Sequence, residues 1–293
     1  RLVGSEMCIR DRYQCAVFAS GYTQGRVAMG DLKLGSTTAV NLPMQVIDSS
    51  PNIVPQACAQ SGVTALTAPQ QMGANGILGI GPLAYESSAL KVYYHVIQGA
   101  GATVLSNVPV ALRLPQPISK LNKYSNGLIL NYPAADPMGA AGMDAELVLG
   151  LNTASNNSSR DAVFYTVSSA ARLRVAYNGR TYDGLLDTGA NHVVFPNTPW
   201  PSCGFGGFFC PATSQSVSVS LGAYTSLPSK TYTFNVADFN TYGSQAIQPG
   251  LAGYSSDNTE FILGLPFLYG RKLFIAIEGQ PTGSVPNPAV GLN

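Results

Sequence analysis

Two short apolar segments that share an Ile-Leu-Gly core constrain the fold of this chain more than any other feature. They read "ANGILGIG" at 74–81 and "EFILGLPF" at 260–267, and each closes a stretch rich in strand-forming residues. One such triplet is common, whereas two in equivalent places indicate an internal duplication. We therefore expect two lobes, residues 13–155 and 156–293, with the boundary where a polar Asn/Ser stretch follows the strand-like "AELVLG".

Glycine and proline punctuate the chain throughout. The 31 Gly and 20 Pro separate short runs of Val, Ile, Leu and Tyr, which predicts an all-β fold. Residues 18–36, "FASGYTQGRVAMGDLKLGS", are expected to form a β-hairpin with a mobile tip, broken into short runs by Gly25 and Gly30. Residues 89–98, "ALKVYYHVIQ", are expected to form one short helix.

The charge balance argues against a nucleic-acid partner. Only 11% of residues are charged, with 16 Lys+Arg against 15 Asp+Glu, so there is no basic field to attract phosphate. No apolar run reaches the roughly 18 residues of a membrane-spanning helix, so none is expected.

The first twelve residues, "RLVGSEMCIRDR", match nothing in the pattern downstream and resemble translated adaptor sequence. We expect residues 1–12 to be non-native and the N-terminal lobe to be truncated. Any signal peptide would have been lost with the missing segment.

Four cysteines remain once those twelve residues are set aside: Cys15, Cys58, Cys203 and Cys210. Cys203 and Cys210 bracket a flexible "GFGGFF" loop that a disulfide would close, which leaves Cys15 to pair with Cys58. The alternative is four free buried thiols. The two histidines, His95 and His192, do not lie at ligand spacing from a cysteine pair, so we expect no metal site and no cofactor.

A carboxylate on a tight turn is the main chemical signal. In "YDGLLDTGANHVVFP" (182–196), Asp187-Thr188-Gly189 lies between two apolar, strand-like runs. Asp and Gly are common turn formers, so the motif is either an ordinary β-turn or one half of a catalytic carboxylate pair. Such a pair hydrolyses an amide by sharing one proton, so that one carboxyl group acts as base on a water and the other as acid.

The order of these elements resembles the two-lobed, pepsin-like aspartic proteases. It runs from a flap-like hairpin through Ile-Leu-Gly, "AELVLG", hydrophobic-Asp-Thr-Gly and a Cys-Cys loop to "FILGLPFLYGRKLFIAIEG". In those proteins each lobe supplies one Asp-Ser/Thr-Gly turn, and a later hydrophobic-hydrophobic-Gly packs beside it in a ψ-shaped motif. Over roughly residues 13–280 the chain is more closely similar to a bacterial family of secreted pepsin-like proteins of unknown function.

The resemblance implies roles for individual residues. Asp187 would be a catalytic carboxylate, Thr188 would hydrogen-bond the matching turn of the opposite lobe, and Gly189 would permit close approach. Tyr22 would cover the substrate as a flap tyrosine, unless it is an ordinary hairpin residue. Asn191 would line the substrate cleft or merely pack.

Residue spacing indicates that the partner carboxylate is missing. Asp187 precedes Gly264 by 77 residues, and the same spacing counted back from Gly79 reaches position 2, where no Asp-Ser/Thr-Gly occurs. Asp11 lies in the segment set aside above. As written, the chain is therefore expected to hold one half-site and to be inactive.

These observations predict an extracytoplasmic aspartic endopeptidase that acts on peptides or proteins. We expect it to be secreted, periplasmic or on the outer cell surface, and to be a monomer. Two alternatives stay open. One is a non-catalytic binding protein on the same scaffold, and the other is a half-site protein that dimerises so that two copies of Asp187 meet.

Overall fold

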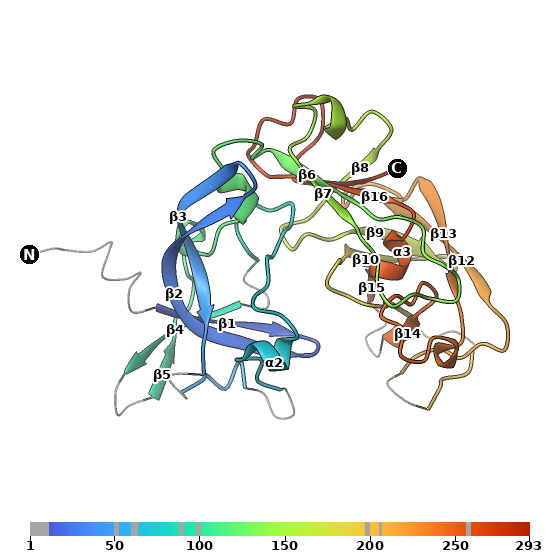
Figure 1. Ribbon diagram of the computed structural model, residues 1–293, viewed down its shortest axis with the longest axis horizontal. Helices are drawn as coiled ribbons and strands as arrows, with labels where there is room; N and C mark the ends of the chain where they lie inside the picture. Colours follow the sequence, from blue (N-terminus) through green and yellow to red (C-terminus); the bar gives the residue numbers. More distant parts are fainter. Residues whose placement is uncertain are drawn as a thin grey trace, which may run out of the picture. The chain divides into compact units, whose positions relative to one another are not determined.

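The structure is a computed structural model in which the described residues are 12–49, 53–59, 64–87, 91–97, 101–196, 200–204, 207–255 and 259–293. The chain divides into two compact units, Arg1–Ser125 and Asn126–Asn293. Strands dominate both units, which confirms the all-β prediction (Figure 1). The segment predicted to be non-native lies outside the described residues except for Arg12, which begins the first strand.

Unit 1 is built on one antiparallel sheet of five strands in the order β3-β2-β1-β4-β5. The strands are β1 (Arg12–Phe18), β2 (Gly21–Leu34), β3 (Thr37–Ile47), β4 (Lys91–Ile97) and β5 (Gly101–Val104). Its short helical turns are α2 (Pro69–Met72), η2 (Val110–Leu112) and η3 (Pro117–Lys120). Cys15, Cys58, Tyr22 and Tyr94 form a buried cluster against this sheet. Cys15 and Cys58 form a disulfide across 43 residues, which restricts the unfolded chain.

The helix predicted over residues 89–98 is wrong, because strand β4 occupies Lys91–Ile97. Strand β4 pairs with β1, and the Tyr94 ring, fully buried, stacks on Tyr13 with 5.6 Å between ring centroids. This long-range pairing decides the conformation, because local propensity is a weak constraint on a short apolar run.

Strand β2 also differs from the prediction, since it runs unbroken through Gly25 and Gly30. A Cβ on Gly25 would lie 1.7 Å from the Val46 carbonyl oxygen, so this glycine permits close approach to β3 and does not end the strand. No hairpin tip lies at these two glycines.

The described residues of unit 2 form two sheets, with strand orders β13-β12-β9-β10-β15-β11-β14 and β7-β6-β16-β17-β8. The strands of the first are β9 (Leu173–Tyr177), β10 (Arg180–Leu186), β11 (Val193–Pro196), β12 (Gln215–Gly222), β13 (Lys230–Val236), β14 (Ala252–Ser255) and β15 (Glu260–Leu263). Those of the second are β6 (Gly127–Asn131), β7 (Glu146–Leu149), β8 (Val163–Thr166), β16 (Lys272–Ala276) and β17 (Ala289–Leu292). The short helical turns are η4 (Ser155–Asn157), η5 (Phe239–Thr241) and α3 (Leu265–Leu268).

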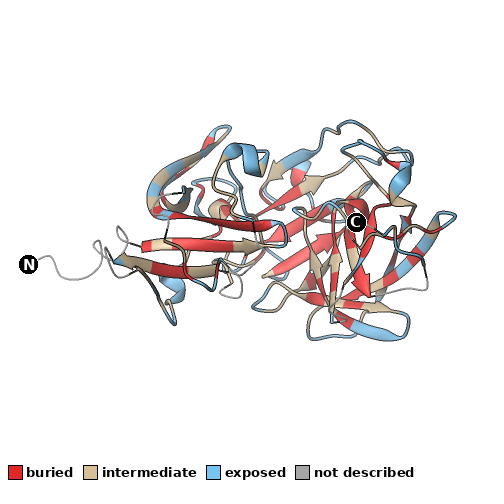
Figure 2. Ribbon diagram, turned by 90° about the horizontal axis from the view of Figure 1, so that it is seen from below, coloured by how far each residue is buried: buried red, intermediate tan, exposed pale blue. Residues whose placement is uncertain are grey.

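The core of the larger sheet centres on Phe195, which is fully buried. Five aromatic rings surround it at centroid distances between 5.2 and 6.2 Å: Tyr177, Trp200, Phe209, Phe234 and Phe261. Buried positions concentrate along the strands (Figure 2). Aromatic pairs of this kind stabilise a core beyond their buried area. The strand that follows the Asp-Thr-Gly turn is therefore firmly anchored.

The two units divide earlier in the chain than the boundary predicted near residue 155. Strands β6 and β7 pair with each other, and β6 pairs with β16, so both belong to a sheet of unit 2. The polar Asn/Ser stretch closes a loop inside that unit. Asn157 is 1% exposed, and its amide oxygen accepts hydrogen bonds from the backbone N–H groups of Thr153 and Ala154 at 2.9 and 2.8 Å.

A largely buried carboxylate in unit 1 makes the stability of the protein dependent on pH. The Glu86 oxygens accept hydrogen bonds from Gln14 Nε2 at 2.7 and 2.8 Å, and the Tyr93 hydroxyl also donates to this carboxylate. Burial raises the pKa of Glu86 above 4.5, although the Tyr93 hydrogen bond and the nearby Lys91 charge oppose the shift. Burial likewise lowers the pKa of Lys91, against the attraction of Glu86.

We expect a Glu86→Gln variant to expose this dependence. The folded state holds the Glu86 proton more tightly than the unfolded state does, so the wild type is favoured below pH 4.5 and loses that contribution as pH rises through the folded pKa. Urea denaturation between about pH 4 and pH 8 measures the difference in unfolding free energy between the two proteins. Glu146→Gln, at an exposed position of β7, is the matched control. A Glu86→Gln difference that does not change with pH would contradict the prediction.

Candidate active-site turn

Asp187 lies on the turn that joins β10 to β11. Its Oδ1 accepts a hydrogen bond from the Gly189 backbone N–H at 2.8 Å, and its carbonyl oxygen accepts one from the Ala190 N–H at 3.2 Å. The Asp187 N–H donates to the Leu263 carbonyl oxygen at 3.1 Å, which ties the start of the turn to the end of β15. The carboxylate is half-buried and held by its own turn.

The second Ile-Leu-Gly segment passes between the two strands that flank this turn. Strand β15 pairs in parallel with β10 on one side and antiparallel with β11 at Val194 and Ile262 on the other. The segment then leaves the sheet at Gly264. A Cβ there would lie 2.2 Å from the His192 carbonyl oxygen and 2.6 Å from that of Ala190, so only glycine fits the crossing. This arrangement is the ψ-shaped motif expected from the sequence.

The Thr188 side chain hydrogen-bonds the Tyr132 side chain, which directly follows β6 in the same unit. The sequence predicted a different contact, with the matching turn of the opposite lobe. Burial raises the pKa of Tyr132, and the hydrogen bond from Thr188 partly offsets that rise. The Tyr132 backbone N–H donates to the Arg271 carbonyl oxygen at 3.1 Å, which ties the backbone of this residue to the segment before β16.

Asn191 and His192 follow the turn and connect it to the second disulfide. Asn191 is exposed, and its Oδ1 lies 2.8 Å from His192 Nδ1. The His192 ring meets Phe208 edge-on at 5.2 Å, and Phe208 in turn stacks on Phe239 at 4.8 Å. Phe208 lies in the loop that the Cys203–Cys210 disulfide closes.

The His192 ring is therefore packed against the loop that the disulfide closes. Burial lowers the pKa of its imidazole. The loop closed by the Cys203–Cys210 disulfide therefore packs, through Phe208, against the residues that follow the Asp187 turn. This contact joins segments that are separated in the sequence.

The residue predicted to be a flap tyrosine has a different environment. Tyr22 is only 8% exposed and packs with Cys15, Cys58 and Tyr94. Its backbone N–H donates to the Thr64 carbonyl oxygen at 2.9 Å. This burial favours the alternative, an ordinary packed strand residue, over a side chain free to close on a substrate.

The first Ile-Leu-Gly segment differs sharply from the second. Phe261 and Leu263 of β15 are fully buried, whereas Ile77 is 56% and Leu78 is 42% exposed. Residues 77–79 belong to no strand, and within the described part of the chain no backbone hydrogen bond joins them to a neighbour. Unit 1, as far as it is described, therefore lacks the strand crossing that supports Asp187 in unit 2.

A three-residue group with metal-ligand spacing consists of Cys203, Cys210 and Asp238. Its two sulfur atoms are bonded to each other, so they cannot act as thiolate ligands. Among the described residues, no helix is long and apolar enough to cross a membrane.

Comparison with known proteins agrees with this geometry. The solved structure of an aspartic proteinase from Irpex lacteus is similar with a TM-score of 0.54 and 17% sequence identity, over 96% of this chain and 80% of that chain. At such identity the likeness establishes the fold, and the predicted pepsin-like architecture is confirmed. A comparison with curated proteins finds no match. The family model described as "Protein of unknown function (DUF3443)" matches residues 3–291, and the chain belongs to that family.

Proposed function

We propose that this chain carries one half-site of an aspartic endopeptidase, with Asp187 as the catalytic carboxylate. The observation that supports this role is the turn itself. The Gly189 N–H donates a hydrogen bond to its carboxylate. Beside the turn, the backbone at Gly264 passes so close to the His192 and Ala190 carbonyl oxygens that only glycine fits there. The hydrogen bond from the Gly189 N–H also occurs in ordinary Asx turns, so the close crossing at Gly264 is the observation that carries the proposal.

The chemistry requires a second carboxylate that faces the same water. Two like charges at close range cannot both ionise easily, so the pair shares a proton and titrates as a unit. Asp-Thr-Gly occurs once in these 293 residues. We therefore expect the chain, as written, to be inactive.

The second carboxylate would come from a strand that pairs beside residues 77–79, as β10 pairs beside β15. Ile77 and Leu78 are exposed and would be covered by such a strand. In this proposal Thr188 and Tyr132 hold the turn from within unit 2, and Asn191 lines the substrate cleft.

A direct test compares two proteins. One is the 293-residue chain, and the other is the same chain extended by any coding sequence that precedes it in its gene. We expect the extended protein to cleave unstructured peptides at acid pH and to be inhibited by pepstatin, whereas the chain alone does neither. An extended protein that contains a second Asp-Ser/Thr-Gly and still cleaves nothing would contradict the proposal.

A non-catalytic binding protein on the same fold is the second candidate, and the single Asp-Thr-Gly is the observation that favours it. The same fold supports unrelated functions, so the site must decide. An extended protein without a second Asp-Ser/Thr-Gly would favour this candidate.

We further propose that the protein acts as a monomer outside the cytoplasm, in the periplasm, in the medium or on the cell surface. The two disulfides, Cys15–Cys58 and Cys203–Cys210, support this location because such bonds persist mainly in oxidising compartments. The proposed substrate is a peptide or protein, and no cofactor is needed for the chemistry.

A further inference from the structure

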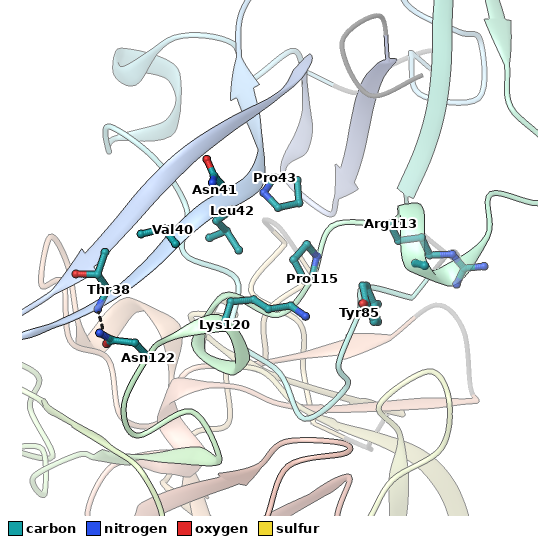
Figure 3. Close-up of a pocket in the computed structure, with 11 residues that line it drawn as sticks. Thr38, Val40, Asn41, Leu42, Pro43, Tyr85, Arg113, Pro115, Lys120 and Asn122 are labelled. Atoms are coloured by element: carbon teal, nitrogen blue, oxygen red, sulfur yellow. Dashed lines mark hydrogen bonds between the residues drawn. The ribbon is translucent and has the colours of Figure 1, made fainter. Parts of the chain in front are cut away.

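Unit 1 contains a pocket of about 460 Å³ beside strand β3 (Figure 3). Its walls include Val40, Leu42 and Pro43 from β3, Pro115 and Lys120 from the segment around η3, and Tyr85. All these residues belong to unit 1. Its volume falls within the range of about 300–1,000 Å³ that is typical of small-ligand sites.

A β-bulge forms the apolar wall. Gly30 of β2 pairs with Leu42 of β3, and Leu32 of β2 pairs with Ala39 of β3. Two residues of β3, at positions 40 and 41, therefore lie opposite the single residue 31 of β2. Bulges often re-aim a side chain beside a site.

Two features hold this bulge in place. Asn41 has a φ of 51°, which asparagine tolerates better than most residues. Its backbone N–H donates to Asp31 Oδ1 at 2.9 Å. The neighbouring Val40 is 67% exposed, so the pocket lining includes a solvent-exposed apolar side chain.

Hydrogen bonds fix the remaining walls relative to β3. Asn122 Oδ1 accepts from the Thr38 N–H at 3.1 Å and from Thr37 Oγ1 at 2.8 Å, and the Asn122 N–H donates to the Thr38 carbonyl at 3.0 Å. The Gln116 N–H donates to the Ala84 carbonyl at 2.9 Å, which holds the Tyr85 segment. The pocket is therefore preformed, and little ordering is needed when a ligand binds.

The charges that line the pocket are of one sign. Lys120 and Arg113 contribute cations, and no carboxylate belongs to the lining. The Lys120 side chain runs across the pocket toward Tyr85, with Nζ 5.4 Å from the ring centroid (Figure 3). In the described part of the chain neither cation forms an ion pair. A cation held next to apolar walls favours an anion that has an apolar body.

We propose that this pocket binds a carboxylate with an apolar body. Lys120 is the charge partner, and Val40, Leu42 and Pro115 contact the apolar part. Two sources share this chemistry: the C-terminal end of a peptide whose last residues are apolar, and a free aliphatic acid.

Isothermal titration calorimetry of the 293-residue protein tests the proposal with three probes: N-acetyl-Leu-Leu, its C-terminal amide, and octanoate. We expect at least one of the two acids to bind, and the acid that binds identifies the source. If the dipeptide acid binds, its amide should bind about tenfold more weakly, because it lacks the charge.

Variants of two exposed lysines complete the test. Lys120→Met keeps most of the length of the side chain but removes its charge, and it should weaken binding of the acid by about tenfold. Lys123→Met is the matched control, since Lys123 is also exposed but does not line the pocket, and it should leave binding unchanged. Failure of both acids to bind, equal binding of the dipeptide acid and its amide, or an unchanged affinity in Lys120→Met would each overturn the proposal.

Discussion

Replacing Gly264 with alanine is expected to destabilise unit 2 by about 3 kcal/mol or more. The added methyl group would lie 2.2 Å from the His192 carbonyl oxygen and 2.6 Å from that of Ala190. Both obstacles are backbone atoms, so no side-chain rotation relieves the overlap. Because the Leu265 N–H donates to the Ala190 carbonyl at 2.8 Å, any shift of that carbonyl also strains the start of α3.

Urea or thermal denaturation measures this effect, and Gly142→Ala is the matched control. A Cβ on Gly142 meets nothing within 4 Å, so its substitution should change the unfolding free energy by less than about 0.5 kcal/mol. A Gly264→Ala variant as stable as the wild type would contradict the close backbone approach at the end of β15, beside the Asp187 turn.

Replacing Asp187 with asparagine is expected to abolish peptide cleavage in any form of the protein that is active, with a loss on the order of 10⁴-fold or more. An asparagine carbonyl oxygen still accepts the hydrogen bond from the Gly189 N–H that Asp187 Oδ1 accepts at 2.8 Å. The turn should therefore fold normally while the exchangeable proton and negative charge are lost. The measurement is kcat/KM for a peptide at acid pH, together with a thermal melt that shows intact folding.

Two further variants separate chemistry from structure. Asp183→Asn lies on the same strand and removes an ion pair with Arg174, so it should affect stability slightly and leave cleavage intact. Tyr132→Phe removes the hydroxyl group that Thr188 hydrogen-bonds. It should lower kcat more than it raises KM, because the turn loses orientation and not substrate contact. Cleavage that survives Asp187→Asn would remove this residue from the mechanism.

Several features were predictable because they depend on short-range patterns. The alternating apolar runs and frequent glycines indicated an all-β chain. Asp187-Thr188-Gly189 between two apolar runs indicated a turn that carries a carboxylate, and the structure places it between β10 and β11. The cysteine count and the short "GFGGFF" loop indicated the pairs that form Cys15–Cys58 and Cys203–Cys210 in the structure.

Other features depended on contacts between distant segments. Residues 91–97 became a strand because β1 was available to pair with them. Strands β6 and β7 joined unit 2 because they form one sheet with β16, which lies far along the chain. No sequence pattern marked Tyr132 as a neighbour of the Asp187 turn. Its contact with Thr188 depends on the tertiary structure, in which β6 pairs with the distant strand β16.

The two Ile-Leu-Gly segments have similar sequences but different structures. By itself the sequence determined that both are apolar, that each ends in a glycine, and that one follows an Asp-Thr-Gly at a set distance. Only the tertiary structure decided that Ile262 is paired on both sides, within a strand that ends at Leu263, whereas Ile77 and Leu78 are exposed and belong to no strand. The physical reason is that a strand is stabilised by its neighbours, and the neighbours of these two similar segments differ.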